Sequence, residues 1–252
     1  MPAGHRRGKQ WYGHGLPYLK TGRLPGHLIV IEGTDGVGRS TQIELLQPWL
    51  ELEGYAVSNT GWTRSPLLAD TINEAKAGHE LTVVTFSLLY AADFADRLEH
   101  QIIPALRAGS IVIADRYMYT AFARNMVMGA DPAWTRELFS MALTPDLVLY
   151  LEIDVDQLVP RVLRGKGMDY WESGMHLALG NDIFDSFQRY QRRLIEEYNL
   201  LAREFRFVTI DARRSIDAIQ SDLREHVSAY LAGVRRRAEA AAPPPLPSAR
   251  RG

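Results

Sequence analysis

A glycine-rich turn between an apolar segment and a helix-forming segment constrains this chain more than any other feature. Four branched apolar residues at 28–31 predict a buried parallel strand. Three glycines within 33–38 then allow a sharp turn whose backbone N–H groups can surround an anion. Ser40 and Thr41 begin a helix whose positive end faces the same anion. The segment therefore predicts a strand–loop–helix unit that binds phosphate.

The loop departs from the phosphate-binding consensus at one position. The consensus is Gly, four residues, Gly, Lys and then Ser or Thr, and Arg39 stands where lysine is expected. Arginine keeps the charge but replaces a compact ammonium with a planar fork. We expect Arg39 to reach the β- and γ-phosphates of ATP and the Ser40 hydroxyl to meet Mg²⁺. The loop residues expected to contact ATP are Gly33, Thr34, Asp35, Gly36, Val37, Gly38, Arg39, Ser40 and Thr41.

Short apolar segments alternate with helix-forming segments between the loop and the C-terminal region. Strands are expected at 28–32, 55–60, 110–114, 146–152 and 206–210. Helices are expected at 40–52, 66–77, 81–108, 117–128, 132–142, 155–164, 180–203 and 214–232. This alternation predicts a three-layer α/β fold, in which helices flank both faces of a five-stranded parallel sheet. Ligands of such sheets bind at the carboxyl ends of the strands, where Glu32 and Asp115 are expected.

The chain of 252 residues, 46% of them hydrophobic, can bury one core, which we assign to a domain at 27–232. Residues 1–26 are expected to be an extension that either lies on the domain or stays loose. Residues 233–252 are rich in Arg, Ala and Pro, which predicts a disordered tail. The glycine-punctuated, basic segment at about 161–175 is typical of a short mobile lid.

Charge and composition restrict the partners of the chain. A formal net charge of −1 argues against a nucleic-acid partner, so any anion is bound by a local cluster. The chain has no cysteine, which is consistent with a reducing compartment. No apolar run approaches the roughly 20 residues that cross a bilayer, so we expect no membrane partner and a cytoplasmic location.

Charged residues follow two further predicted strands. Asp115 can hold a metal ion or a substrate hydroxyl, and Arg116 can bind a phosphate through two parallel hydrogen bonds. A structural ion pair at the strand end is the alternative for these two residues. Arg64 also follows a predicted strand, where it either faces the same site or is simply exposed.

Several motifs, in order and spacing over residues 27–232, resemble the thymidylate kinase family of phosphate-loop nucleoside monophosphate kinases. The matching segments are Glu-Gly-Thr-Asp-Gly-Val-Gly-Arg-Ser-Thr-Gln at 32–42, Thr-Arg-Ser-Pro at 63–66, Leu-Leu-Tyr-Ala-Ala-Asp at 88–93, Pro-Ala-Leu at 104–106, Asp-Arg-Tyr at 115–117, Asp-Tyr-Trp-Glu at 169–172 and Ile-Asp-Ala at 210–212. The resemblance implies a homodimer, formed through the helices near 81–108 and 117–142, that uses ATP and Mg²⁺ to phosphorylate dTMP.

The resemblance also implies roles for individual residues. Asp35 is expected to approach the sugar or phosphate of the acceptor, and Tyr90 to stack on its base. The arginines are expected to act on phosphate: Arg64 and Arg116 on the acceptor, and Arg161 and Arg164 as lid residues over ATP. The same motifs imply further contacts, which are Phe94, Tyr117 and Trp171 with the substrate and Ala212 with ATP.

Three departures from the family pattern leave the activity open. Arg39 replaces the loop lysine, Phe94 replaces an arginine that reads the base, and Tyr170 replaces a lid arginine. Arg97, one helical turn beyond Phe94, either reaches toward the base or pairs with Asp93 in solvent, and neither interpretation is favoured. The alternatives to a thymidylate kinase are a nucleotide-binding pseudo-kinase with a regulatory role and a kinase for a different nucleotide or nucleoside.

Overall fold

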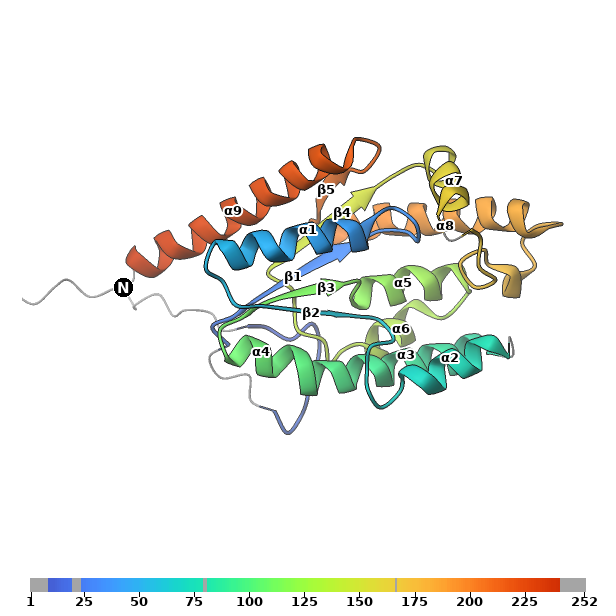
Figure 1. Cartoon of the computed structure of the whole chain (residues 1–252). Coiled ribbons are helices and arrows are strands. Elements are labelled where there is room, and N and C mark those ends of the chain that lie inside the picture. Colours follow the sequence, from blue (N-terminus) through green and yellow to red (C-terminus); the bar gives the residue numbers. More distant parts are fainter. Residues whose placement is uncertain (1–8, 20–23, 79–80, 166, 241–252) are drawn as a thin grey trace, which may run out of the picture.

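The centre of the molecule is a sheet of five parallel strands in the order β2-β3-β1-β4-β5 (Figure 1). This computed structural model describes residues 9–19, 24–78, 81–165 and 167–240. The strands are β1 (His27–Glu32), β2 (Val57–Gly61), β3 (Ile111–Asp115), β4 (Leu147–Glu152) and β5 (Val208–Asp211). The predicted three-layer α/β fold with a five-stranded parallel sheet is confirmed.

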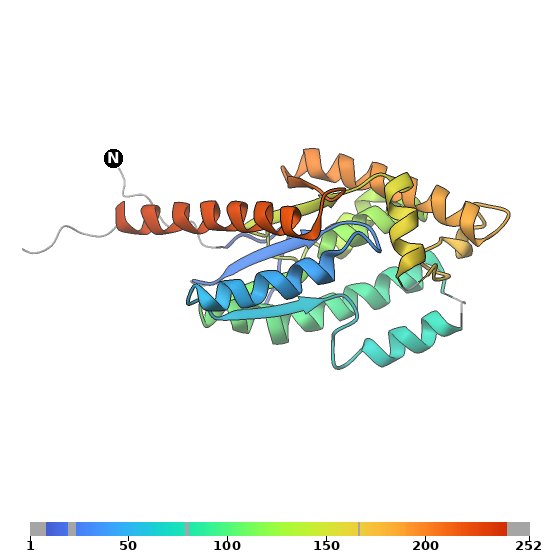
Figure 2. The ribbon, with the colours of Figure 1, turned by 45° about the horizontal axis from the view of Figure 1, so that its top comes forward.

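Helices cover both faces of the sheet (Figure 1). One face carries α1 (Arg39–Leu52) and α9 (Ile216–Ala240), which contact each other. The other face carries α3 (Val83–Arg97), α4 (Ile103–Arg107), α5 (Met118–Val127), α6 (Pro132–Leu138) and α8 (Ile183–Glu204), with α2 (Ala69–Ala77) against α3. The helix α7 (Val155–Arg164) lies at the carboxyl end of the sheet, beside the loop between β1 and α1 (Figure 2).

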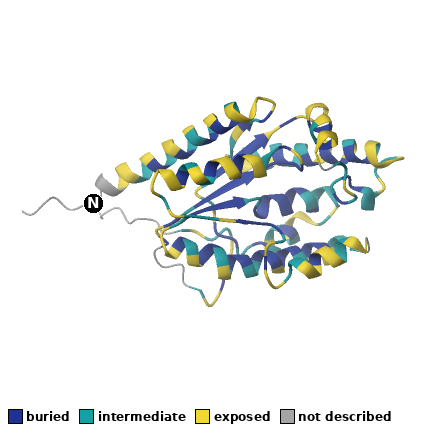
Figure 3. Cartoon of the chain, viewed as in Figure 1, coloured by how far each residue is buried: buried dark blue, intermediate teal, exposed yellow. Residues whose placement is uncertain are grey.

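The alternation of side chains along β1 divides the core into two. Leu28 and Val30 pack with the aromatic-rich cluster under α3, α5 and α8, whereas Ile29 and Ile31 pack with α1 and α9. All four side chains are fully buried, and each contributes about 1.5–3 kcal/mol of transfer free energy. Burial on both faces explains why β1 is a continuous apolar run rather than an alternating one. The three central strands, β1, β3 and β4, are accordingly mostly buried, as Figure 3 shows.

The topology opens a crevice at the carboxyl end of β1. The strand pairs with β3 on one side and with β4 on the other, and Ile31 is in register with Asp115. The chain leaves β1 toward β2 beyond β3, and later crosses to β4 on the opposite side. A strand whose neighbours are reached in opposite directions is where ligands bind in open α/β sheets. The glycine loop after Glu32 therefore lies at the position that the topology favours for a ligand.

The predicted helix at 81–108 is interrupted by a short π-helix at Leu98–Ile102. Pro104 has no N–H to donate to the carbonyl of His100, so the helix cannot keep a uniform ladder at this point. The predicted helix at 66–77 also begins later, at Ala69. Its delay has a local cause, because the Ser65 hydroxyl accepts from the N–H groups of residues 67 and 68 and holds them in a turn. The remaining boundaries differ from the expected ones by at most four residues, apart from the end of α9.

The N-terminal extension lies on the domain at residues 9–19. Trp11 forms an antiparallel bridge with Leu143, and the Tyr12 ring packs 5.6 Å from that of Phe122. Lys9 pairs with Asp146, just before β4. These contacts lie on the loop before β4 and on α5, not at the carboxyl end of the sheet. Residues 1–8 and 20–23 of the extension are outside the described residues.

The C-terminal helix corrects the expectation of disorder from residue 233. Helix α9 continues to Ala240, because arginine and alanine are strong helix formers even where no apolar face remains to be buried. Arg235 also covers the ring of Tyr55, at 5.4 Å from the ring centroid. The rest of the expected tail, 241–252, lies outside the described residues.

Candidate functional site

The glycine loop follows the backbone path that its sequence predicts. Gly33, Gly36 and Gly38 all have positive φ angles, of 148°, 77° and 106°. A Cβ atom at Gly36 would overlap Val162 of α7, so this position needs glycine for packing as well as for conformation. The Thr34 hydroxyl is buried and has no hydrogen-bond partner among the described residues. The loop is thus a preformed turn with an unused donor, as a phosphate cradle requires.

Arg39 is folded into the loop. Its Nε donates to Asp115 Oδ1 at 2.7 Å, and its Nη1 donates to the carbonyls of Gly33, at 2.5 Å, and of Thr34. The side chain is only 10% exposed. The planar guanidinium therefore ties the end of β3 to the glycine loop through three acceptors, a geometry that a lysine ammonium would not reproduce.

Oxygen ligands for a magnesium ion are available beside Arg39. Ser40 lies exposed in the first turn of α1, and Asp115 ends β3 with its carboxylate facing the loop. A hydroxyl and one carboxylate fit Mg²⁺, which keeps most of its waters and takes further oxygens from phosphate. Within the described ranges, no cluster of three or more His, Asp or Glu side chains could hold a metal by itself.

A pocket of about 320 Å³ opens on the α9 side of the loop. It is lined by the loop residues 36–38, by Arg161 of α7 and by Arg214 and Ile216 at the start of α9. Arg161 Nη1 lies 3.4 Å from the carbonyl of Val37. Arg214 was not predicted, although its position just after the end of β5 is visible in the sequence.

Two residues predicted to contact ATP lie differently. Arg164 is exposed at the end of α7, and Ala212 is fully buried, with its N–H bonded to the Glu152 carbonyl at 2.9 Å. Neither lines the pocket, whereas Thr41 does. The pocket thus combines glycine-loop backbone with two guanidinium groups, Arg161 and Arg214.

On the other side of the loop, one carboxylate holds two arginines. Asp35 Oδ1 accepts from Arg116 Nη2, and its Oδ2 accepts from Arg124 Nη2 at 2.8 Å. We call Asp35, Arg116 and Arg124 the Asp35 cluster. Its side chains are 8%, 12% and 11% exposed, respectively. Arg124 was not predicted, although it lies one helical turn beyond Thr120 on the helix that follows Arg116.

Both arginines of the Asp35 cluster remain charged at neutral pH. Burial, aided by the charge of Arg124, lowers the pKa of Arg116 to about 10. Burial also acts to lower the pKa of Arg124, but nearby tyrosines and Glu172 outweigh it and raise that pKa. Arg116 has a φ of +70°, a conformation that is unusual for a residue other than glycine and that recurs at functional sites.

Glu32 anchors the start of α5 beneath the Asp35 cluster. Its fully buried carboxylate accepts from the Tyr117 N–H at 2.8 Å and from the Thr120 hydroxyl at 2.7 Å. The Tyr198 hydroxyl lies 3.2 Å from the same group. Burial raises the pKa of Glu32, against the lowering effect of these hydrogen bonds. Glu32 therefore positions the helix that carries Arg124.

Three residues expected to contact the substrate lie in the core. The side chains of Phe94, Arg97 and Tyr117 are fully buried, and the Phe94 and Tyr117 rings meet edge to face at 4.9 Å. Arg97 donates from Nε to Asp93 Oδ2 at 2.8 Å and stacks over the Trp62 ring. The prediction that Arg97 reaches the base is therefore wrong. Its alternative, pairing with Asp93, is correct, but the pair is buried rather than solvated.

Arg64 is not brought to the Asp35 cluster. Its Nη1 donates to Asn59 Oδ1 at 2.9 Å, along the edge strand β2. The residue before it, Thr63, has a φ of +58°, which turns the chain away at this strand end. The structure therefore does not bring Arg64 together with Arg116, and Arg124 is the second arginine that contacts Asp35.

Tyr90 and Trp171 belong to a row of aromatic rings beside the Asp35 cluster. Phe86 stacks between them, 4.3 Å from the Tyr90 ring and 5.7 Å from that of Trp171. Burial raises the pKa of the Tyr90 hydroxyl, and a hydrogen bond with Arg124 opposes that rise. Tyr90 is thus next to the cationic cluster, where the sequence predicts the acceptor.

The segment expected to be a mobile lid is docked at residues 167–175. Trp171 is 5% exposed and donates from Nε1 to the Lys76 carbonyl at 2.9 Å. Gln191 and Ser186 of α8 donate to the carbonyls of residues 172 and 173 at 2.7 and 2.8 Å. Glycine punctuation suggested a loose segment, but the aromatic and carbonyl groups between the glycines find partners on two helices. Residue 166 is outside the described residues.

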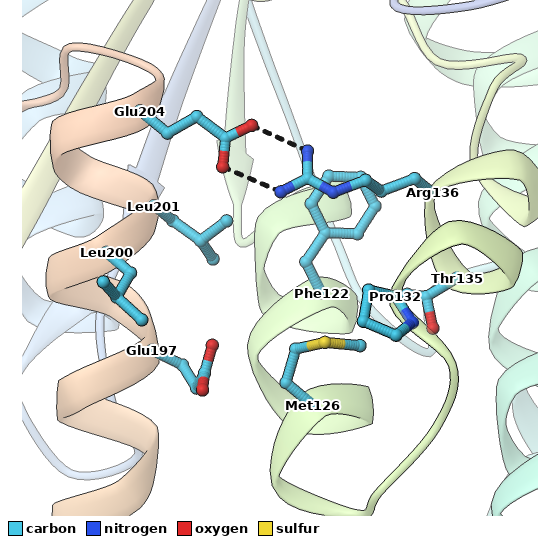
Figure 4. A pocket seen from close by; sticks show the side chains of 9 residues that line it. All are labelled: Phe122, Met126, Pro132, Thr135, Arg136, Glu197, Leu200, Leu201 and Glu204. Atoms are coloured by element: carbon cyan, nitrogen blue, oxygen red, sulfur yellow. Dashed lines mark hydrogen bonds and ion pairs between the residues drawn. The ribbon is translucent and has the colours of Figure 1, made fainter.

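A second hollow, of about 380 Å³, lies between α5, α6 and α8 (Figure 4). Arg136 crosses its rim and pairs with Glu204 through two hydrogen bonds of 2.7 and 2.8 Å. None of its lining residues belongs to the glycine loop, to α7 or to the strand ends. This hollow is therefore separate from the candidate site.

The described helices include none that is long and apolar enough to cross a membrane.

Comparison with known protein families matches residues 31–223 to the thymidylate kinase family. The probable thymidylate kinase 2 of Saccharolobus solfataricus is 38% identical over 210 residues, which cover 82% of this chain and 98% of that protein. A probable thymidylate kinase of Pyrococcus horikoshii is 33% identical, covering 84% of this chain and 100% of its own length. The thymidylate kinase of Caldanaerobacter subterraneus is 30% identical, with coverage of 84% and 100%. The chain therefore belongs to the thymidylate kinase family, a family of nucleoside monophosphate kinases.

Proposed function

We propose that this protein transfers the γ-phosphoryl group of ATP to dTMP, with Mg²⁺, and releases ADP and dTDP. The observation that carries this proposal is the arrangement around the glycine loop. A pocket with Arg161 and Arg214 lies on one side, and the Asp35 cluster lies on the other. Phosphoryl transfer needs two anions positioned end to end and little covalent catalysis, so cations on both sides of one loop suit it.

Each group of this site has a proposed role. The loop backbone and Arg39 bind the β- and γ-phosphates, and Arg161 and Arg164 of α7 neutralise charge on the transferring group. Arg116 binds the acceptor phosphate, Asp35 orients it and Tyr90 contacts the base. Ser40 and Asp115 would hold Mg²⁺, which neutralises phosphate charge when it is bound.

The substrate-binding role of Trp171 is proposed through the lid. Its ring closes the aromatic row beside Tyr90, so a docked lid excludes water from the acceptor. Water exclusion limits hydrolysis of ATP and strengthens the electrostatic contacts inside the site. Because Phe94 and Tyr117 are fully buried, their proposed role is indirect: their rings pack in the core beneath the substrate-facing aromatic residues and hold them in place.

An acceptor panel tests the proposal. The wild-type protein is mixed with labelled Mg·ATP and with dTMP, dUMP, dCMP, dGMP or thymidine, and the products are separated. We expect dTDP from dTMP and the highest kcat/KM for that acceptor. Preference for another nucleotide would support the alternative acceptor that Phe94 suggests. No product from any monophosphate would contradict the kinase proposal.

A pseudo-kinase is the second candidate, because the Arg39 guanidinium is already bound to Asp115 and to two loop carbonyls. Arg39→Lys separates the two candidates. In a kinase, Arg39→Lys changes kcat moderately and Arg39→Met abolishes turnover. In a pseudo-kinase, the wild type binds ATP by calorimetry without turnover, and Arg39→Lys creates activity.

We also propose a homodimer that uses the outer face of α3. Val84 and Leu88, one helical turn apart on this face, are 51% and 50% exposed. Two large apolar side chains side by side on a helix surface are typical of an interface. A cytoplasmic location is proposed from composition and the absence of cysteine.

A further inference from the structure

Arg124 is a buried cation that the family motifs do not account for. It projects from α5 onto the glycine loop, and its side chain is 11% exposed. The helix is held in place one turn earlier, where Thr120 donates to Glu32 at 2.7 Å. A guanidinium on an anchored helix is preorganised for a ligand, because little side-chain entropy remains to be lost on binding.

Asp35 bridges two guanidinium groups, and Arg124 is also hydrogen-bonded to Tyr90. Each arginine carries five N–H donors, and one from each is bonded to a carboxylate oxygen of Asp35. The Nε of Arg116 is buried without a hydrogen-bond partner among the described residues. Two forked cations with spare donors match a phosphate group, which presents three oxygens and about two negative charges.

Arg124, rather than Arg64, is the arginine that shares a carboxylate with Arg116. Arg64 is bonded to Asn59 on the edge strand, whereas Arg124 shares the Asp35 carboxylate with Arg116. The charged and titratable groups that act on Arg124 or surround it are Asp35, Arg116, Glu172, Lys76, His176, Tyr90, Tyr190 and Tyr198. Among these groups, Asp35 is the carboxylate in direct contact with Arg124.

We infer that Arg124 binds the phosphate of the acceptor nucleotide together with Arg116, so that the site requires a monophosphate rather than a free nucleoside. This inference rests on the proposed function and adds to it a residue that determines the class of acceptor. A neutral nucleoside brings no charge to the two cations and gains nothing from Arg124, whereas a monophosphate supplies about two negative charges to a pair that shares one carboxylate.

A role limited to positioning Asp35 would have different consequences. If Arg124 only held the Asp35 carboxylate, its removal would affect every acceptor equally and would have no further effect once Asp35 is neutral. If Arg124 binds phosphate directly, its removal weakens monophosphate binding alone, with or without the charge of Asp35. The dependence on the acceptor phosphate therefore distinguishes the two roles.

The experiment compares Arg124→Met, Arg124→Lys and Arg124→Gln with the wild type by calorimetry, using dTMP and thymidine as separate ligands. Arg136→Met is the matched control, because Arg136 is an ion-paired arginine of the neighbouring helix outside the site. We expect Arg124→Met and Arg124→Gln to weaken dTMP binding about 10- to 100-fold, since a hydrogen bond to a charged group is lost. Thymidine binding stays unchanged, and Arg124→Lys recovers part of the dTMP affinity.

Equal losses for dTMP and thymidine would overturn the inference, as would unchanged dTMP binding in Arg124→Met. In an Asp35→Asn background, Arg124→Met is expected to weaken dTMP binding again, and no further loss there would assign Arg124 to positioning alone. Should Arg124→Met not fold, Arg124→Lys and Arg124→Gln still give the comparison. Failure of the proposed function is distinguishable, because the wild type would then fail to phosphorylate dTMP whatever the effect of Arg124.

Discussion

Replacement of Arg97 by methionine should destabilise the fold and leave acceptor binding almost unchanged. Arg97 and Asp93 are each fully buried and are joined at 2.8 Å. Methionine fills a similar volume but leaves the Asp93 carboxylate in the core without its counter-ion. Breaking a buried pair in this way costs about 3–5 kcal/mol.

The lower end of that range applies here. Asp93 keeps two backbone donors, the N–H groups of Ser65 at 3.0 Å and Thr63 at 3.3 Å. The Arg97 guanidinium itself is imperfectly paired, because its Nη2 is buried without a partner among the described residues. We therefore expect a loss of about 3 kcal/mol in the free energy of unfolding.

Urea denaturation followed by tryptophan fluorescence measures this loss. The double variant Asp93→Asn with Arg97→Met should recover part of the stability, since no unpaired charge is then buried. Steady-state kinetics on the folded variant should give a KM for dTMP within about three-fold of the wild type, a difference worth less than 1 kcal/mol. A loss below about 1 kcal/mol together with a large rise in KM would refute the structural role and restore Arg97 as a base-reading residue.

Three further predictions concern packing, pH and assembly. Gly36→Ala introduces a Cβ that overlaps Val162, at a backbone φ of +77° that alanine rarely adopts. We therefore expect the KM for ATP to rise, and the free energy of unfolding measured by calorimetry to fall by about 1–3 kcal/mol. Unchanged values would contradict the close packing of α7 against the loop. Burial and the charge of Lys9 lower the pKa of His27 to about 4, so the unfolded state binds the extra proton as pH falls from 6.5 toward 4. The free energy of unfolding should therefore drop by about 1–2 kcal/mol over this window, after allowance for the partial exposure of His27. His27→Gln should make the free energy of unfolding, measured by urea denaturation, less dependent on pH between 6.5 and 5. Leu88→Glu should convert the proposed dimer to a monomer in light scattering, and a wild type that is monomeric at every concentration would refute the dimer.

Local sequence was sufficient to predict the scaffold. The apolar run of β1, the spaced glycines and the following helix are short-range features, and each glycine occupies the positive φ that its type permits. The order of strands and helices followed from hydrophobic periodicity. The π-helix at Leu98–Ile102 was not predicted, although Pro104 is visible in the sequence. A single proline does not determine whether a helix ends or continues through a π-helical turn.

The identity of the side chains around the ligand site was decided by tertiary packing. Periodicity predicts which residues share one face of a helix, but not whether that face packs in the core or lines a ligand site. It therefore could not decide the positions of Phe94, Arg97 and Arg124. The fold buries the first two against Trp62 and turns Arg124 onto Asp35. The sequence by itself therefore determined the phosphate loop and the succession of strands and helices along the chain, which depend on local conformation and hydrophobic periodicity. Only the tertiary structure decided which arginines share the site, because that depends on distances between α5, β2 and the loop that no local pattern contains.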